Sequence, residues 1–290
     1  MKIKKFLKFY YGRINYLLSC IQWFIFLLIY KLKHKSSASF LQKPQKIVEG
    51  KTLLIAPHAD DELLSSFTLL KRVKDITVYY CEFTGTNKSD DNKKKRFDEI
   101  VTLCDLMNIS FISGDGSSSS LKNAIVEGEF DVIVIPSIVD WHPQHRLVSY
   151  NLLDVIEELE QHITLYSYSV TVPNESGREV LYMPLTKYEQ EEKYKFFRKI
   201  YLSQSFMPLY RFRINERING ICSGSYAAEP FLIHPIPEWK CEVTRIRAEE
   251  NSSSNSKFML LAEELKYNLG KMNKIRSLSR EMYKIVEENN

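Results

Sequence analysis

The sequence predicts an α/β fold in which a Rossmann-like, mostly parallel sheet carries helices on both faces. Short apolar segments of strand length alternate with longer segments whose apolar residues recur at helical spacing. Alternation at this spacing is typical of βαβ units, which build parallel sheets. In chain order we expect strands at 52–56, 76–83, 109–112, 131–136 and 162–170, and helices at 61–73, 93–107, 119–128, 146–160 and 188–204.

The chain of 290 residues divides by composition into four segments. Residues 1–35 combine a basic N-terminus with an apolar helix, and residues 36–50 have the Ser, Pro and Gly content of a linker. Residues 51–236 form the α/β domain. Residues 237–290 alternate apolar and charged side chains at helical spacing and predict a C-terminal helical extension, which either covers the domain, pairs with a partner or lies on a membrane.

Residues 14–30 contain only three polar side chains, Asn15, Ser19 and Gln22. As a helix this segment spans roughly 25 Å, slightly less than the ~30 Å hydrocarbon core of a bilayer. Basic residues flank both ends, so the orientation is not decided, and no small-residue cleavage site ends the apolar run. We therefore expect a membrane-associated protein with a single N-terminal anchor at 14–30. A buried core helix is the alternative.

The overall composition excludes little else. A formal net charge of +4 is too small to indicate nucleic-acid binding. The five cysteines form no Cys-x-x-Cys pair, and Cys81 and Cys104 fall in apolar elements, as buried free thiols do. This favours a reducing compartment, so we expect the α/β domain on the cytoplasmic side. The oligomeric state is not predicted.

A first polar cluster follows the first strand. His58, Asp60, Asp61 and Glu62 lie within five positions, where the strand ends and the next helix begins. In α/β sheets this carboxyl edge is where ligands bind. The plainer interpretation is that the aspartates cap the helix and that His58 is a loop residue.

A second cluster, Asp140-Trp-His142-Pro-Gln144-His145, follows the strand at 131–136. Because the carboxyl ends of parallel strands share one edge of the sheet, the two clusters can meet. His58, Asp61 and one of the two later histidines would then form an N/N/O zinc site with a fourth position open to water, which is the arrangement of catalytic zinc. Asp60 would remain free to take a proton, and the other histidine would face the substrate.

These paired motifs resemble the signatures of the PIG-L/LmbE family of zinc-dependent N-acetylglucosaminide deacetylases, His-Pro-Asp-Asp-Glu and His-Pro-Asp-His. Three further segments match the family in order: Arg96-Phe-Asp-Glu99, Ser203-Gln204 and Tyr226-Ala-Ala-Glu229-Pro-Phe231. Two ordered motifs at this separation are a specific signal for a site. The resemblance covers roughly residues 50 to 235 and neither end of the chain.

The resemblance implies one zinc per chain and an N-acetylated amino-sugar substrate. It assigns His58, Asp61 and His145 to the metal, Asp60 to the general base, His142 to the carbonyl oxygen or leaving amine, and Arg96 to substrate binding.

Two positions depart from the family pattern. Ala59 replaces the usual proline, which loosens the turn without removing a ligand. Gln144 replaces the usual aspartate beside His142, and a neutral amide cannot raise the pKa of that imidazole as a carboxylate does. Either His142 is a weaker acid–base partner here, or Asp140 supplies the missing charge.

The sequence leaves three functions open. The first is a metal-dependent deacetylase that acts on an N-acetylglucosamine-type sugar, for which a membrane anchor favours a lipid-linked or membrane-bound glycan. The second is a membrane-tethered glycan-binding protein with a degenerate site, which Gln144 permits. The third is a hydrolase of another amide or ester, because such motifs specify the attacking water and not the acyl group.

Overall fold

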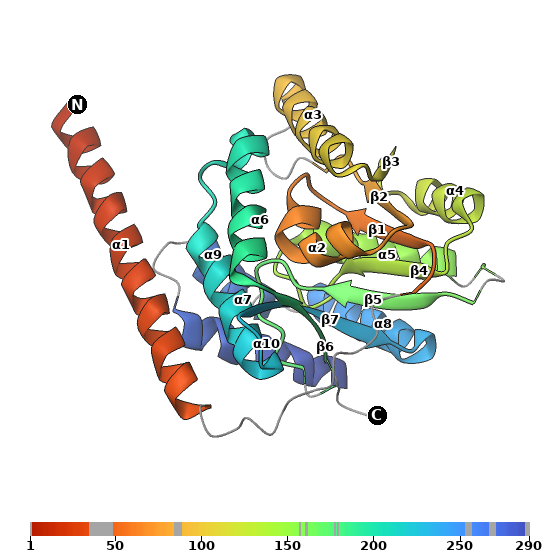
Figure 1. The fold of residues 1–290 in the computed structure, drawn as a ribbon. Helices are drawn as coiled ribbons and strands as arrows, with labels where there is room; N and C mark the ends of the chain where they lie inside the picture. Colours follow the sequence, from red (N-terminus) through yellow and green to blue (C-terminus); the bar gives the residue numbers. More distant parts are fainter. Residues whose placement is uncertain are drawn as a thin grey trace.

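The computed structural model describes residues 2–34, 49–83, 89–156, 158–159, 162–176, 178, 180–252, 257–266 and 271–287, with side chains from Arg13 onward except those of residues 252 and 266. Figure 1 shows one α/β body with a long N-terminal helix along its edge. Most of the expected linker, 36–50, lies outside the described residues.

Seven strands form a single sheet in the order β3-β2-β1-β4-β5-β7-β6. The five strands from β3 to β5 are parallel, and β7 runs antiparallel to both β5 and β6. This confirms the predicted α/β fold with a mostly parallel sheet. The strands are β1 (Thr52–Ala56), β2 (Ile76–Tyr80), β3 (Ser110–Ser113), β4 (Val132–Pro136), β5 (Thr164–Tyr168), β6 (Val180–Leu185) and β7 (Ala227–His234).

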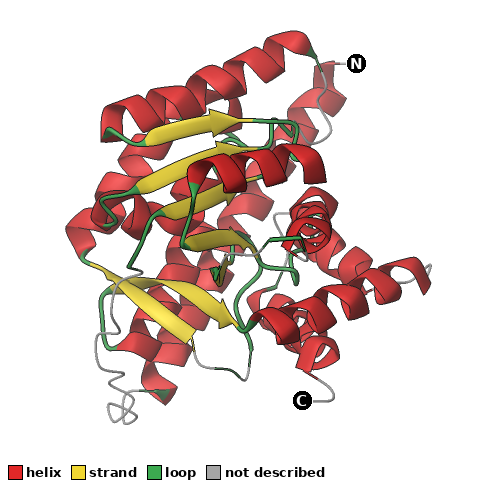
Figure 2. Ribbon diagram, turned by 90° about the vertical axis from the view of Figure 1, so that its right-hand side faces the viewer, coloured by secondary structure: helices red, strands yellow, loops and turns green. Residues whose placement is uncertain are grey.

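The central strands are buried on both faces, which explains their continuous apolar sequences. Along β1, Leu53 and Ile55 face one core while Leu54 and Ala56 face the other. Figure 2 shows the sheet with helices packed around it. The helices are α1 (Lys2–Lys33), α2 (Asp61–Arg72), α3 (Asp90–Met107), α4 (Ser118–Gly128), α5 (Pro143–Ile156), α6 (Lys187–Ile200), α7 (Leu209–Ser223), α8 (Ile236–Ser252), α9 (Lys257–Lys266) and α10 (Met272–Glu287), with a 3₁₀ turn at Leu202–Gln204.

The C-terminal extension covers one face of the domain. Trp239 of α8 and Met282 of α10 are fully buried in the same core as Leu53. The Tyr283 hydroxyl also lies 3.2 Å from Ser137 Oγ, just after β4. Of the roles expected for this extension, the structure therefore supports covering the domain.

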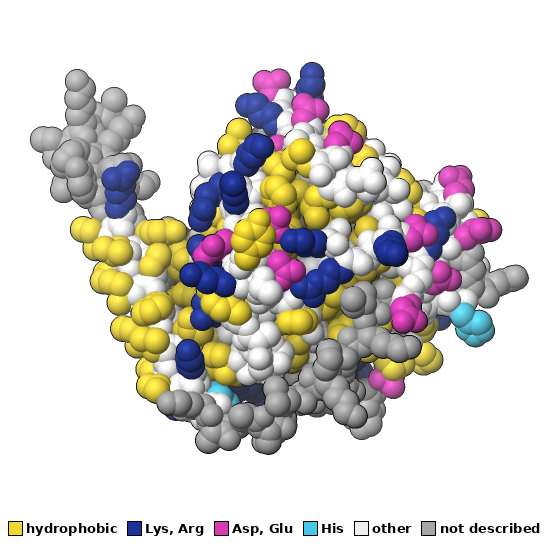
Figure 3. Space-filling model, viewed as in Figure 1, with side chains coloured by type: hydrophobic (Ala, Val, Ile, Leu, Met, Phe, Trp, Pro, Cys, Tyr) yellow, Lys and Arg dark blue, Asp and Glu magenta, His cyan; other side chains and the backbone are white. Residues whose placement is uncertain are grey.

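Helix α1 packs on the body along one stripe only. Trp23 is 1% exposed and lies edge-on to Tyr210 of α7, whose hydroxyl is 2.7 Å from Ser19 Oγ. The opposite side carries exposed apolar side chains, visible along the left of Figure 3. The segment Arg13–Lys33, with a mean hydropathy of 1.4, is long and apolar enough to cross a membrane, and only 17% of its most apolar window is buried.

Candidate metal centre

The two polar clusters meet at one edge of the sheet because β1 and β4 are neighbours. Leu54 of β1 is in register with Val134 of β4, so both strands end at the same level. Beyond β1 a four-residue turn leads into α2, whose first residue is Asp61. Beyond β4, α5 begins at Pro143, which places His145 in its first turn instead of in a loop.

The turn before α2 is strained at Asp60. Its φ of 129° and ψ of −26° lie outside the regions that ordinary side chains favour. Local hydrogen bonds hold this conformation: the Asp60 N–H donates to Glu62 Oε2 at 3.1 Å, and the Tyr201 hydroxyl donates to Glu62 Oε1. Strain of this kind costs about 1–3 kcal/mol and is concentrated at functional sites. Here it places the Asp60 carboxylate in the pocket beside His58.

Three donor atoms form a nearly equilateral triangle. His58 Nδ1 lies 3.0 Å from His145 Nε2 and 3.2 Å from Asp61 Oδ2, and His145 Nε2 lies 3.1 Å from the same oxygen. Ligands about 2.0–2.1 Å from a tetrahedral zinc are separated by about 3.4 Å. The triangle therefore needs only small shifts to hold such an ion.

The electrostatics of the triangle also fit a cation. Burial raises the pKa of the Asp61 carboxyl, but the charged ring of His145 outweighs it and holds that pKa well below its usual range. Burial lowers the pKa of His145, but Asp61 and Asp140 raise it to about 10. Without a metal, the proton on His145 therefore supplies the positive charge that balances the carboxylates of Asp61 and Asp140. A divalent cation meets the same requirement.

Gln144 fixes the tautomer of His58. Its Oε1 can only accept and lies 2.8 Å from His58 Nε2, so that nitrogen carries the hydrogen and Nδ1 offers its lone pair to the triangle. The family resemblance places residue 144 beside the His142 ring. In the structure the Gln144 side chain contacts His58 instead. The backbone N–H of Gln144 donates to His142 Nδ1 at 3.2 Å, which leaves the hydrogen of neutral His142 on Nε2.

Asp140 contacts both later histidines, His142 and His145. Its Oδ1 accepts the backbone N–H of His142 at 2.8 Å, and its Oδ2 lies 3.2 Å from His145 Nδ1. The carboxylate therefore raises the pKa of His145, and it also partly opposes the lowering of the His142 pKa. Burial and the neighbouring rings of His58 and His145 lower the pKa of His142 to about 3, which keeps it neutral. The three histidines together form a cluster that fits a metal site, with His142 at its rim.

Arg96 reaches the same pocket from α3. Its guanidinium binds Gln204 Oε1 at 3.0 and 3.1 Å when the side-chain amide is turned so that its oxygen faces the arginine. Glu99, three residues further along α3, accepts from the backbone N–H and the hydroxyl of Ser203 at 2.7 and 2.6 Å. The segments Arg96-to-Glu99 and Ser203-Gln204 are thus joined.

The assembled pocket has a volume of about 340 Å³. We call it the metal-site pocket; its lining includes all five triangle and rim residues together with Arg96 and Gln204: His58, Asp60, Asp61, Arg96, His142, His145 and Gln204. Burial, then Asp61, raises the pKa of the Asp60 carboxyl well above its usual value, while Arg96 opposes this.

Comparison with solved structures identifies the fold. A conserved protein from Thermus thermophilus superimposes with a TM-score of 0.51 at 19% identity, over 65% of this chain and 96% of that one. The zinc-inhibited form of a teicoplanin deacetylase superimposes with a TM-score of 0.50 at 13% identity, over 63% of this chain and 98% of that one. The chain thus shares its fold with these solved proteins, as the PIG-L/LmbE resemblance implied. A deacetylase–teicoplanin complex gives 0.50 at 14% identity, over 63% and 96%.

At these identities the likeness concerns the fold. No protein-family model matches the sequence, and no curated protein shows significant sequence similarity to it. The shared fold thus confirms the architecture that the motifs predicted, whereas the roles of the individual residues rest on the geometry of the site.

Several residues that line the metal-site pocket were not singled out from the sequence. Trp141, Val170, Thr171, Phe206 and Met207 all line the metal-site pocket. Trp141 lies between Asp140 and His142, and Phe206 follows Ser203-Gln204 at 75% exposure. For Trp141 and Phe206, the sequence signal was a large aromatic side chain beside a polar motif.

Proposed function

We propose that the chain is a zinc-dependent deacetylase that removes the N-acetyl group from an N-acetylglucosamine-type sugar. The observation that carries this proposal is the triangle of His58, Asp61 and His145, with Asp60 and His142 at its rim. The likeness to solved deacetylases supports the same reaction class.

Two nitrogens and one carboxylate oxygen form a donor set that zinc accepts in catalytic sites. Bound there, zinc would polarise the acetamide carbonyl and acidify water. Asp61 and the two histidines would hold the ion, while Gln144 and Asp140 contact the two histidine rings from outside the triangle.

Asp60 and His142, the two residues at the rim of the triangle, have different roles in proton transfer. Asp60 is buried and held by its strained turn, so its carboxylate is placed to accept a proton from the attacking water. His142 presents an Nε2–H donor, which suits it to the developing oxyanion or to the leaving amine. Arg96, braced by Gln204, is a donor for sugar hydroxyl groups.

Helix α1 supports a membrane-linked substrate. Its exposed side is apolar while its other side holds the domain, so a membrane that takes up this helix would keep the pocket near lipid-linked glycans. Placement of the α/β domain on the cytoplasmic side remains part of the proposal.

One of the two rival functions is weakened by a specific contact. The glycan-binding alternative rested on Gln144 as a sign of degeneration, yet Gln144 orients a metal ligand. A hydrolase of another amide or ester would use the same metal and base, so only substrate assays separate it from a deacetylase.

Zinc content tests the donor set. Purified protein is expected to contain about one zinc per chain, with iron as the alternative metal. His145→Ala should lose the metal because one side of the triangle disappears, whereas His142→Ala should retain it. His162→Ala, an exposed histidine outside the pocket, is the matched control. Elemental analysis after metal reloading measures all four proteins, and absence of stoichiometric binding by the wild type would contradict both hydrolase functions.

Membrane fractionation tests α1. Leu17, Phe24 and Leu28 recur on one face of the helix at 46–60% exposure, away from the stripe that contacts the body. Replacing all three with Gln should move the protein to the soluble fraction and leave its thermal unfolding unchanged.

The matched control replaces three apolar residues of similar exposure elsewhere: Leu106, Val126 and Met259. This control should stay with the membranes. If the α1 variant also persists in carbonate-washed membranes, the anchor lies elsewhere in the chain.

A further inference from the structure

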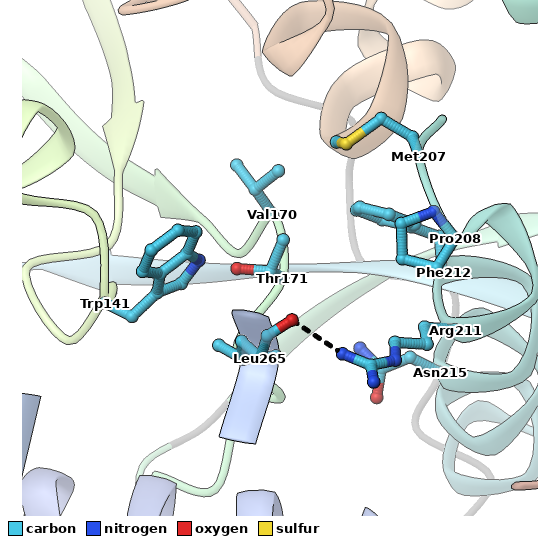
Figure 4. A pocket seen from close by; sticks show the side chains of 9 residues that line it. All are labelled: Trp141, Val170, Thr171, Met207, Pro208, Arg211, Phe212, Asn215 and Leu265. Carbon is cyan, nitrogen blue, oxygen red and sulfur yellow. Dashed lines mark hydrogen bonds between the residues drawn. The ribbon is translucent and has the colours of Figure 1, made fainter. Parts of the chain in front are cut away.

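A second cavity adjoins the metal-site pocket. It has a volume of about 100 Å³, and we call it the annex. Four residues, Trp141, Val170, Thr171 and Met207, line both the annex and the metal-site pocket. Figure 4 shows these residues along one side of the annex. A ligand bound at the metal site can therefore extend into the annex past these side chains.

The far wall of the annex is largely apolar and comes partly from the C-terminal extension. Phe212 of α7 and Leu265 of α9 line it. Arg211 ties these helices together: its Nη1 donates to the Leu265 carbonyl at 3.0 Å, and its guanidinium lies 5.2 Å from the Trp23 ring centre of α1. The annex thus depends on segments outside the expected α/β domain, 51–236.

Two buried polar atoms of the lining residues have no hydrogen-bond partner among the described residues, Thr171 Oγ1 and Asn215 Oδ1. In Figure 4 the Thr171 hydroxyl points toward the indole nitrogen of Trp141, on the side that the annex shares with the metal-site pocket. A buried polar atom left unpaired is unfavourable, and few such atoms occur in native proteins. An apolar cavity with a few unpaired polar atoms is the usual form of a small-molecule site.

We propose that the annex binds a short apolar chain of the substrate, whose polar linkage hydrogen-bonds to Thr171 where the chain enters. This inference rests on the proposed function and narrows the substrate to amino sugars that carry such a chain. A cavity of roughly 150 Å³ accepts benzene, so the annex admits a chain of only a few carbons. The chain is either the acyl group of the amide or the start of a lipid aglycone, and the chemistry of recognition is the same for both.

Two substrate series distinguish these sources. In one, the N-acetyl group is kept and the methyl glycoside is lengthened to butyl; in the other, the methyl glycoside is kept and the acetyl group is lengthened to butanoyl. One of the two series should raise kcat/KM by about 10- to 100-fold, because the added methylenes leave water. Leu265→Trp fills the annex and should abolish this gain.

Two further variants serve as controls for Leu265→Trp. Leu260→Trp makes the same change at an exposed position of α9 and should retain the gain. Leu265→Ala enlarges the annex, so the preferred chain should become longer even if the tryptophan variant folds poorly. No gain in either series, or a gain that survives Leu265→Trp in a folded protein, would overturn the proposal.

Binding separates this proposal from the proposed reaction. Calorimetric titration with methyl and butyl N-acetylglucosaminides reports the chain preference without turnover. Suppose that the wild type binds the butyl glycoside more tightly and Leu265→Trp does not, while no acetate is released from any substrate. This result would support the annex proposal and contradict the deacetylase function. If acetate is released with no preference for a chain in either series, the annex proposal fails alone.

Discussion

Asp60→Asn should lower acetate release from N-acetylglucosaminyl substrates by about 10²–10⁴-fold while the protein keeps its metal. The carboxylate lies in the metal-site pocket but outside the triangle of donor atoms. Asparagine has the same shape, tolerates positive φ as aspartate does, and leaves the backbone N–H free to bind Glu62. The loss would therefore report the missing proton acceptor and not a collapsed turn.

The neighbouring position supplies the matched control. Asp61→Asn makes the same chemical change in the residue whose Oδ2 contacts both His58 and His145. It should lose metal and activity together. Full activity in Asp60→Asn would show that another group takes the proton, and retention of metal by Asp61→Asn would remove that carboxylate from the ligand set.

The sequence was sufficient for the parallel half of the fold and for the meeting of the two clusters. Strands buried on both faces are apolar throughout, and β1 and β4 are such strands. Once they are placed side by side, the residues that follow them must share an edge. This is why His58 and His145 could be paired although they lie 87 positions apart in the chain.

The antiparallel strands β6 and β7 were not predicted, and their prolines explain why. Pro184 and Pro230 interrupt the patterns that identify strands, since proline has no N–H to donate to a sheet. In the structure Pro230 pairs with Tyr182 inside the sheet. The fold tolerates these prolines because other residues of β7 complete the ladder with β5 and β6.

The contacts of Gln144 could not be deduced from the sequence either. Its amide reaches His58 because α5 begins at Pro143 and turns that side chain toward the end of β1. A shift of a few residues in the start of α5 changes the direction in which the Gln144 side chain points. The boundary expected from the sequence, 146–160, placed Gln144 in a loop beside His142.

A buried ion cluster behind the site was likewise hidden in the sequence. Lys193 of α6 is fully buried, and its Nζ lies 2.5 Å from Glu216 Oε1 and 2.6 Å from Glu229 Oε1. In an amphipathic helix rich in Lys and Glu, such a lysine resembles a solvent-exposed one. Its burial follows from the packing of α6 on α2 and could be found only in three dimensions.

This cluster supports α2, the helix that begins with Asp61. The helix is interrupted at Ser66, whose φ of −135° and ψ of 25° are not helical. The Leu64 carbonyl accepts from Lys193 Nζ at 2.7 Å, and the N–H groups of Phe67 and Thr68 donate to Glu229 at 3.1 and 2.8 Å. The charged side chains thus satisfy backbone groups that the interruption would leave unpaired.

Lys193→Met should therefore reduce the free energy of unfolding by about 3–5 kcal/mol, the usual effect of breaking a buried ion pair. Two buried carboxylates, Glu216 and Glu229, would remain without their cation, and the Leu64 carbonyl would lose its donor. Urea denaturation of the metal-loaded protein measures the change. Lys195→Met, an exposed lysine on the same helix, should change stability by less than about 0.5 kcal/mol.

The pH dependence of that loss identifies its cause. Burial already raises the pKa of Glu216 while Lys193 lowers it, so removing the ammonium raises this folded-state pKa further. A carboxyl whose folded pKa exceeds its unfolded value destabilises the protein increasingly as the pH rises between the two. The deficit of Lys193→Met should therefore be smaller at about pH 5 than at about pH 8. Adding Glu216→Gln should recover part of it by removing one of the two charges. A deficit that is independent of pH, with no recovery in the double variant, would mean that lost packing and not charge accounts for the effect.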